Sequence, residues 1–507
     1  MAHVRICPNQ FHRRAILGFM HGLSAVATTG IYCRPGCSAR PKPENVRRFD
    51  LPAAAEACGY RACLRCRPYR SSPTLDWTTG PELVCRAVHM IIDGALDEQG
   101  EEHLAATLGV SARHLRRLFG SHVGATPDQL ARSCRAHFAR RLLDDTDLSV
   151  TEIAFASGFG SVRQLNRACK EIFQAPPREL RARRRRGDRL VADGGLLLRL
   201  AFTGPLDWDT MLAYFRARAI PGVEHATDTS YRRTMVVDGD PGVLELTRGD
   251  ADELLLRAHL PHWEGLIHIV QRARRIFSLD APVDEASNHL SHDPLIGPLI
   301  AARPGLRVPG AWDPLETGVH AIVGQQVSVA GATTIMGRLV QRLGQPVPGV
   351  HALGLSHTFP PADALAKADL GRLGLPSARA TAIQQFAQAV ERGDVPLDRS
   401  APLEQLVDAI TETRGVGPWT AHYIALRLGE RNAFPADDLG LRRALKNLEP
   451  HGTPSLEELA SHWSPWRATA ATHLWHAQGA PLPAAQPAGP TDAAVYSRGH
   501  REQPRAR

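Results

Sequence analysis

Residues 406–427 read LVDAITETRGVGPWTAHYIALR, and this stretch is the most informative part of the chain for predicting its architecture. The pattern predicts two helices with Arg414, Gly415, Val416 and Gly417 as the turn between them. Glycine lets a backbone approach a phosphate closely, and the amides at the start of the second helix can bind it. Gly415 and Gly417 are therefore predicted to contact a phosphate backbone.

The residues that follow this turn strengthen the pattern. FPADDLGL occupies residues 434–441, and residues 463–467 and 473–475 read WSPWR and HLW. This series resembles the helix-hairpin-helix superfamily of DNA glycosylases, specifically its AlkA-type 3-methyladenine branch. The resemblance extends back through IVGQQVS at residues 322–328 and through the block before it. It implies an enzyme that excises alkylated bases from DNA.

By its position in this resemblance, Asp438 is the expected catalytic carboxylate. Cleavage of an N-glycosidic bond builds positive charge on the sugar, after the nucleotide has been flipped out of the duplex. A carboxylate in a cleft of low dielectric constant stabilises that charge and orients water. The alternative is that Asp437 and Asp438 cap the helix that begins near Leu439. Both roles are compatible if one carboxylate caps the helix and the other faces the pocket.

Three aromatic residues are expected to form the base pocket, namely Tyr423, Trp475 and Trp419. Alkylated purines such as 3-methyladenine carry a positive charge, and an electron-rich ring attracts a cation. The competing interpretation is hydrophobic core, which suits Trp419 as well as a pocket role does. Gln326 matches the position at which relatives insert a wedge side chain into DNA, although many wedge residues are apolar.

The resemblance also implies a monovalent cation held at the turn by the backbone carbonyls of Thr411, Thr413 and Val416. Members of the superfamily that form a Schiff base use a lysine near this turn. Residues 401–445 contain no lysine. We therefore expect a monofunctional glycosylase, which leaves an abasic site.

The N-terminal part carries a different motif, four cysteines in the spacing C-x3-C-x25-C-x2-C. Two close pairs suit tetrahedral zinc, because each pair can span one edge of the tetrahedron. The predicted ligands are Cys33, Cys37, Cys63 and Cys66. Spacing alone favours a zinc ion that only stabilises the fold.

The residues around these cysteines favour a reactive zinc site over a purely structural one. TTGIYCRPGCSAR at residues 28–40 and GYRACLRC at 59–66 closely resemble the Ada-type methyl-acceptor domain. The resemblance implies that Cys33 is a reactive thiolate, which takes a methyl group from a DNA phosphotriester. It also makes Thr29 and Arg40 candidate phosphate contacts. Methylation of Cys33 removes one negative charge, which weakens the repulsion from DNA.

An internal repeat lies between these two parts. LAATLGVSARHL at residues 104–115 and IAFASGFGSVRQL at 153–165 each fit a helix, a tight turn and a second helix. Two such units in tandem resemble the AraC-type DNA-binding domain. Several polar residues on the second helices are predicted to contact DNA, the alternative being a solvated face; they are Arg113, Arg116, Arg163, Gln164 and Arg167.

Together the motifs predict a multidomain chain, which 507 residues allow. The expected order is a small zinc-bound α/β domain at 1–72, an all-α double helix-turn-helix at 73–187, an α+β domain with an antiparallel sheet at 190–305, and an all-α helix-hairpin-helix glycosylase domain at 306–480. The α+β domain is expected to contain strands at 196–202, 231–237, 243–247 and 253–258. Residues 481–507, rich in Pro, Ala and Arg, are predicted to be disordered.

Composition indicates the partners and the compartment. The net charge of +8 favours an anionic partner, foremost double-stranded DNA, with RNA polymerase as a further candidate. No apolar run reaches the ~18 residues of a membrane-spanning helix, so a membrane partner is not expected. All nine cysteines lie within residues 7–169, and this odd, clustered set indicates reduced thiols in the cytoplasm. We expect a monomer.

Three hypotheses remain open at this point. The chain is a combined alkylation sensor and glycosylase, or a transcription regulator whose glycosylase half only binds DNA, or a glycosylase with a structural zinc module that targets it to DNA. Asp438 and the aromatic residues favour the first hypothesis over the second. Methylation of Cys33 by a phosphotriester would separate the first from the third.

Overall fold

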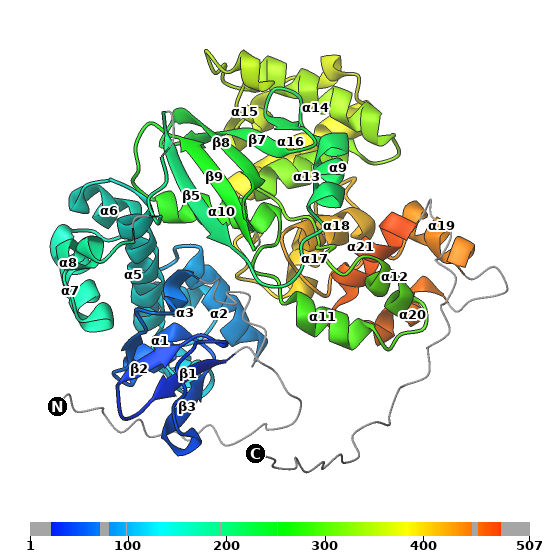
Figure 1. Ribbon diagram of the computed structural model, residues 1–507. Coiled ribbons are helices and arrows are strands. Elements are labelled where there is room, and N and C mark those ends of the chain that lie inside the picture. The colour runs from blue at the N-terminus through cyan, green and yellow to red at the C-terminus, as the bar shows by residue number, and fades with distance from the viewer. Residues whose placement is uncertain are drawn as a thin grey trace, which may run out of the picture.

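The computed structural model describes residues 22–70, 81–97, 99–185, 187–191, 194–250, 252–448 and 455–477. The tail predicted at 481–507 lies outside these residues. Figure 1 shows the five-stranded sheet, in green, between the N-terminal parts and the helical C-terminal part. Within the described residues, no helix is both long enough and apolar enough to cross a membrane.

A small sheet in the order β3-β1-β2-β4 forms the N-terminal part. β1 pairs antiparallel with β2 and β3, whereas β2 and β4 run parallel. The parallel pairing brings the end of β2 beside the turn that follows β4, where the Cys63 amide donates to the Tyr32 carbonyl over 3.0 Å. The elements are β1 (Leu23–Val26), β2 (Ile31–Cys33), β3 (Val46–Phe49), α1 (Pro52–Ala57) and β4 (Arg61–Ala62).

The helices α2–α8 follow among the described residues, and they contain two helix-turn-helix units, α3–α4 and α6–α7, joined by the long helix α5. Gly109 and Gly158 make the two turns with φ of 71° and 76°, a left-handed conformation that glycine adopts without strain. Ser111 and Ser161 cap the second helix of each unit through their side chains. The helices are α2 (Glu82–Ile92), α3 (Glu101–Thr107), α4 (Ala112–His122), α5 (Pro127–Asp145), α6 (Val150–Ala156), α7 (Val162–Phe173) and α8 (Pro177–Ala182).

The third part is an antiparallel sheet in the order β5-β9-β8-β7-β6. The predicted strands are confirmed, and the short edge strand β6, which the sequence pattern did not indicate, completes the sheet. Along β5, buried and half-buried residues alternate, as expected for a sheet with one face on a core. The elements are β5 (Leu196–Ala201), α9 (Trp208–Arg218), β6 (Glu224–Ala226), β7 (Ser230–Val237), β8 (Asp240–Arg248), β9 (Glu253–His259) and α10 (Leu266–Ile276).

The C-terminal part is helical, as predicted. Its core is built mainly from α13, α14, α16, α18 and α21. The helices are α11 (Val283–Leu290), α12 (Ile296–Ala302), α13 (Pro314–Val323), α14 (Val329–Leu343), α15 (Ala362–Lys367), α16 (Ser377–Arg392), α17 (Leu403–Thr411), α18 (Pro418–Arg427), α19 (Leu439–Leu448), α20 (Leu456–His462) and α21 (Arg467–Ala477). The helices α17 and α18 flank the predicted glycine turn.

The four parts are packed together rather than strung along the chain. One hydrophobic core is continuous from Tyr32 in the small sheet, through Leu165 in the second helix-turn-helix unit, to Leu256 in the five-stranded sheet. The first helix-turn-helix unit packs in a second core with α2, the start of α5, and Leu51 and Ala53 of the zinc domain. Polar contacts tie this second core to the third part, such as the 2.7 Å ion pair between Asp93, at the end of α2, and Arg275 of α10. The described parts are therefore in direct contact.

Candidate active site and zinc site

The carboxylate of Asp438 lies just before α19, half-buried, and is held on both oxygens. Trp419 Nε1–H donates to Oδ2 and Trp475 Nε1–H donates to Oδ1, each over 2.9 Å. The Leu441 amide also donates to Oδ1, over 2.9 Å. Asp438 therefore caps the helix and faces the two indoles at once. Asp437 is exposed and pairs with Arg442 instead, so the expectation that the two aspartates divide these roles is replaced by one residue that has both.

The glycine turn precedes α18, the helix whose Trp419 donates to this carboxylate. Gly415 has φ of 89°, and Gly417 is the residue before the first turn of α18, the helix that carries Trp419. Both glycines are exposed, so their backbone is open to a phosphate. Val416 is buried beneath them and donates its amide to the Thr413 carbonyl over 2.9 Å.

The three predicted aromatic residues are brought together. The rings of Trp419 and Tyr423 lie nearly parallel, with centroids 5.8 Å apart, because the residues are one helical turn apart on α18. Trp475 from α21 meets Tyr423 edge-on at 6.1 Å. All three are half-buried rather than fully buried. The hydrogen bond to Asp438 favours the pocket role over the core role for Trp419.

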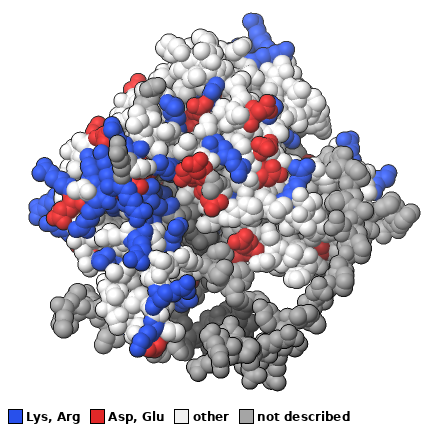
Figure 2. Space-filling view, in the orientation of Figure 1, with Lys and Arg blue, Asp and Glu red and all other residues white. Residues whose placement is uncertain are grey.

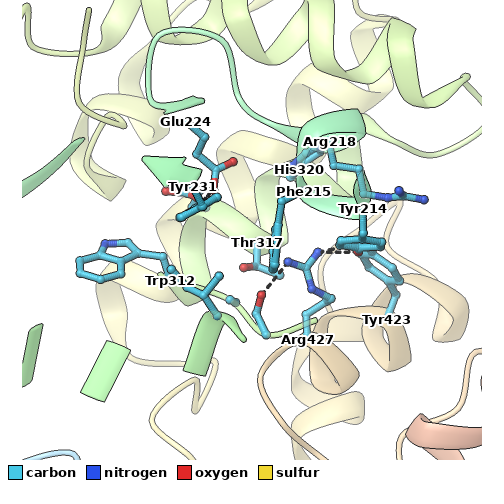
Figure 3. Close-up of a pocket in the computed structure, with 14 residues that line it drawn as sticks. Tyr214, Phe215, Arg218, Glu224, Tyr231, Trp312, Thr317, His320, Tyr423 and Arg427 are labelled. Carbon is cyan, nitrogen blue, oxygen red and sulfur yellow. Dashed lines mark hydrogen bonds between the residues drawn. The ribbon is translucent and has the colours of Figure 1, made fainter. Parts of the chain in front are cut away.

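Two further residues contact this group of aromatic residues, and the sequence analysis predicted neither. Tyr214 extends the three rings into what we call the aromatic wall, and Arg427 lies behind this wall. The hydroxyls of Tyr214, from α9, and Tyr423 lie 3.1 Å apart, and Arg427 Nη1 donates to both, over 3.1 and 3.2 Å. Figure 3 shows these three side chains pointing toward one another. Arg427 could have been found, because it is one turn after Tyr423 on the same helix face. Tyr214 could not, because it comes from another domain.

The pKa values of the two hydrogen-bonded phenols, Tyr214 and Tyr423, are shifted in opposite directions. Burial raises the pKa of Tyr214 to about 12. Burial acts in the same direction on Tyr423, but the charges of Arg427 and Arg218 outweigh it and lower the pKa of that phenol. The cavity behind these rings has a volume of about 30 Å³, which is room for a water molecule or two and not for a base.

The candidate wedge residue is on the turn between α13 and α14. Gln326 is exposed and has φ of 58°, a left-handed conformation that is unusual for a residue with a side chain. Its neighbour Gln325 anchors the turn, because the amide Nε2 donates to the Gly415 carbonyl over 3.1 Å and to the Thr420 hydroxyl over 2.9 Å. The turn with Gln326 is thus fixed beside the glycine turn.

The four predicted zinc ligands converge at the other end of the chain. The sulfurs of Cys33, Cys37, Cys63 and Cys66 all lie within 4.8 Å of one another. Zinc–sulfur bonds of about 2.3 Å in a tetrahedron place sulfurs about 3.8 Å apart, so the cluster fits zinc closely. Burial and the charges of the neighbouring cysteines raise the pKa of Cys33, and burial raises that of Cys66 to about 12, whereas burial at Cys63 is outweighed by hydrogen bonds from the backbone at Cys66 and Arg65, which lower its pKa. Cys33 and Cys66 therefore need a cation beside them to be thiolates at neutral pH.

The predicted phosphate contacts of this domain, Thr29 and Arg40, are both exposed. The Thr29 hydroxyl donates to the Val26 carbonyl over 3.4 Å, which fixes it in the turn after β1. Cys33 ends β2 and is 5% exposed, whereas the cysteines on the following turns are more open. Cys33, the candidate methyl acceptor, is therefore the least exposed of the four cysteines in the cluster.

The predicted DNA contacts on α4 and α7 are all exposed, namely Arg113, Arg116, Arg163, Gln164 and Arg167. Three are engaged within the protein, since Arg116 pairs with Glu101, Arg167 pairs with Glu171 at 3.7 Å, and the Gln164 side chain accepts from the Gly160 amide over 3.0 Å. Figure 2 shows Lys and Arg side chains concentrated over the region of α6, α7 and α8. This basic face suits a nucleic acid.

Four family models match successive parts of the chain. They are the metal binding domain of Ada at residues 20–69, a helix-turn-helix domain at 104–183, the AlkA N-terminal domain at 197–313, and the HhH-GPD superfamily base excision DNA repair protein at 319–468. The zinc cluster, the α3–α8 region, the sheet and the Asp438 site each fall within one of these matches.

Curated relatives match both long and short stretches. A probable bifunctional transcriptional activator/DNA repair enzyme AlkA of Mycobacterium tuberculosis is 39% identical over 456 residues, 89% of this chain and 92% of the relative. DNA-3-methyladenine glycosylase 2 of Escherichia coli is 33% identical over 54% of this chain and 95% of its own length. The Escherichia coli bifunctional transcriptional activator/DNA repair enzyme Ada is 32% identical over 31% of this chain and 43% of its own.

The first of these matches extends over nearly the whole chain, and the order of the four models agrees with the order of parts in the fold. The zinc cluster and the carboxylate site are both present with their predicted residues. The chain therefore belongs to the family of bifunctional AlkA/Ada-type transcriptional activator and DNA repair enzymes.

Proposed function

We propose that the chain is a monofunctional DNA glycosylase that hydrolyses the N-glycosidic bond of alkylated bases such as 3-methyladenine, with Asp438 as the catalytic carboxylate. One observation carries this proposal, the carboxylate of Asp438 held by two indole N–H groups beside an exposed glycine turn. The named activity of the Escherichia coli glycosylase relative agrees with it.

The arrangement explains what Asp438 does in the reaction. As the bond between base and sugar breaks, positive charge develops on the sugar, and the fixed carboxylate stabilises that charge. Because Trp419 and Trp475 each donate to one carboxylate oxygen, the group cannot rotate away from the sugar. The same carboxylate orients the attacking water. With no lysine in residues 401–445, the product is an abasic site.

The flipped base is received by the aromatic group of Trp419, Tyr423 and Trp475. Gly415 and Gly417 bind the phosphate backbone through their exposed amides, and the backbone carbonyls at this turn hold a monovalent cation. Gln326 enters the space that the flipped nucleotide leaves. The support for the last role is its exposed position and the anchoring of its turn by Gln325.

Cys33 is the proposed methyl acceptor of the zinc domain. Its sulfur attacks the methyl carbon of a DNA methylphosphotriester, the carbon–oxygen bond breaks, and the phosphodiester anion leaves. Zinc held by the four cysteines supplies one thing, sulfurs that stay deprotonated at neutral pH. The transfer removes one negative charge from the cluster and so strengthens DNA binding. Thr29 and Arg40 contact the phosphates.

In this proposal the second helices of the two helix-turn-helix units enter the major groove of double-stranded DNA, with Arg113, Arg116, Arg163, Gln164 and Arg167 as the contacting residues. Activation of transcription then requires RNA polymerase as a second partner. We further propose that the chain acts as a monomer in the cytoplasm, where the clustered thiols stay reduced.

Release of free base from methylated duplex DNA tests the glycosylase proposal. Asp438→Asn keeps a side-chain oxygen for the Leu441 amide, so the helix cap survives while the negative charge is lost. We expect release of 3-methyladenine to fall by at least a hundredfold in this variant. Asp437→Asn is the matched control, because that carboxylate is exposed and pairs only with Arg442 among the described residues.

Each outcome selects one hypothesis. Equal release by the wild type and Asp438→Asn would mean that another group performs the reaction. No release by the wild type would favour the regulator whose glycosylase half only binds DNA. Methylation of Cys33, measured by mass spectrometry after incubation with methylphosphotriester DNA, separates a reactive zinc site from a structural one.

A further inference from the structure

Arg427 is a cation behind the aromatic wall whose charge has no direct counterion. Its guanidinium donates to the hydroxyls of Tyr214 and Tyr423 and to the carbonyls of Pro309 and Gly310, the last two over 2.7 and 2.8 Å. All four acceptors are neutral. Within the described part of the chain, no carboxylate oxygen lies within 4.0 Å of this guanidinium. The positive charge is therefore directed at the two phenol rings.

A second cation, Arg218, lies on one of the same rings. Its guanidinium carbon is 4.2 Å from the ring centroid of Tyr214, close enough for a strong cation–π contact. Arg427 is 5.4 Å from the centroid of Tyr214 and 5.9 Å from that of Tyr423. Figure 3 shows both arginines converging on the tyrosine pair. Each phenol of the wall thus has a protein cation as a partner.

The other charged groups of the cavity cancel these two charges only in part. Glu224 and Glu316 line it, and both are bound by the buried Arg233, over 3.3 and 2.7 Å. His320 also lines the cavity, and burial lowers its pKa to about 4, so it is neutral at physiological pH. Three guanidinium groups against two carboxylates therefore leave one net positive charge around the cavity, and Arg218 and Arg427 hold it on the side of the tyrosines.

A cation on an aromatic ring draws the electron density of that ring toward itself. A second cation near the same ring is then attracted less strongly, and the two cations also repel each other. We propose that Arg218 and Arg427 determine the lesion preference of the site, by reducing the advantage of positively charged alkylated purines and so extending excision to neutral damaged bases. The inference rests on the proposed glycosylase function and goes beyond it, because it assigns the choice among substrates.

The test compares kcat/KM for two substrates, release of 3-methyladenine from methylated DNA and release of hypoxanthine from a duplex oligonucleotide. The first base is released from a cationic nucleoside, and the second from a neutral one. Arg218→Met is expected to raise the ratio of the first to the second about fivefold, in line with the strength of one cation–π contact. Arg218→Lys retains the charge and is expected to keep the wild-type ratio.

Arg427→Met is expected to shift the ratio in the same direction. Because Arg427 also binds two backbone carbonyls, its variant could unfold, and the Arg218 pair then decides the question alone. An unchanged ratio in Arg218→Met would overturn the inference, as would a wild type that releases no hypoxanthine. Loss of all release from the wild type, or full activity of Asp438→Asn, would instead overturn the proposed function.

Discussion

Trp475 on α21 donates its indole N–H to Oδ1 of Asp438 over 2.9 Å, across 37 residues of sequence. Trp475→Phe keeps an aromatic ring in the pocket and removes this donor. A hydrogen bond to a charged group is worth about 1.5–3 kcal/mol, so we expect single-turnover base release to slow by about 10- to 100-fold. The measurement is free-base release under enzyme excess, which reports the chemical step.

A second tryptophan offers a matched control for that prediction. Trp463 is fully buried and donates its Nε1–H to Asp293 over 2.9 Å, with no contact to Asp438. Trp463→Phe removes the same kind of hydrogen bond from the same domain. We expect it to lower thermal stability and to leave the single-turnover rate unchanged. Equal slowing by both variants would show that the Trp475 bond acts only through stability.

The glycine turn shows what local sequence can predict. The helices α17 and α18 are adjacent in the chain, so apolar spacing and the turn glycines suffice to predict both. The four zinc ligands are also close in sequence within each pair, and their convergence follows from their spacing. The strand β6 was missed because its three residues, Glu224–Ala226, are mostly polar and lie at a sheet edge.

The pocket wall shows where local sequence stops. Tyr214 is 209 residues before Tyr423 and comes from α9, so only the packing of two domains brings the hydroxyls together. The two roles of Asp438 could be predicted from local sequence only in part. A helix cap is visible in sequence, whereas the indole donors come from two other helices. Resemblance supplied the identity of the catalytic residue, but not the neighbours that fix its orientation.

Buried histidine should make the stability of the C-terminal domain depend on pH. His473 is 3% exposed, and burial lowers its pKa to about 4. In the unfolded chain the ordinary value is about 6.5, so the unfolded state binds the proton first as pH falls. The stabilising contribution is complete above pH ~6.5 and is lost between there and pH ~4. From pH 7 to 5 we expect a loss of about 2 kcal/mol.

Urea unfolding of wild type and His473→Gln, measured at pH 7 and pH 5, checks this expectation. The variant should be less stable at pH 7, because a buried group is replaced, but should lose less stability on acidification. Other groups that titrate in this range, such as His476, are present in both proteins. Parallel pH dependence in the two proteins would therefore contradict the assignment to His473.

Zinc content should depend on the four predicted ligands and not on cysteine in general. We expect one zinc per chain in the wild type, measured by atomic emission, and a loss of zinc in Cys37→Ser. Cys169→Ala is the control, because Cys169 is fully buried in α7, far along the chain from the cluster. Unchanged zinc in Cys37→Ser would remove that residue from the ligand set.

The linker before the five-stranded sheet, residues 187–191, is held by ion pairs and hydrogen bonds that join three domains. Asp145 at the end of α5 accepts from Arg70 of the zinc domain over 2.9 Å and from Arg199 of β5 over 3.2 Å, while Arg199 also donates to the Asp188 carbonyl over 2.8 Å. Asp145 is 3% exposed, and Arg199 is partly exposed. Arg199→Met should therefore cost about 2 kcal/mol, between the values for exposed and buried ion pairs.

We expect this cost to appear as local opening, because Arg199 joins the linker to both neighbouring domains. Hydrogen exchange at residues 187–191 should accelerate in Arg199→Met, while base release stays at the wild-type rate, since none of these residues contacts the Asp438 site. Arg257→Met is the control, because Arg257 lies on the adjacent strand β9 and pairs only loosely with Glu245, at 3.8 Å. Equal acceleration in both variants would mean that the linker responds to the sheet as a whole rather than to the pairing with Asp145.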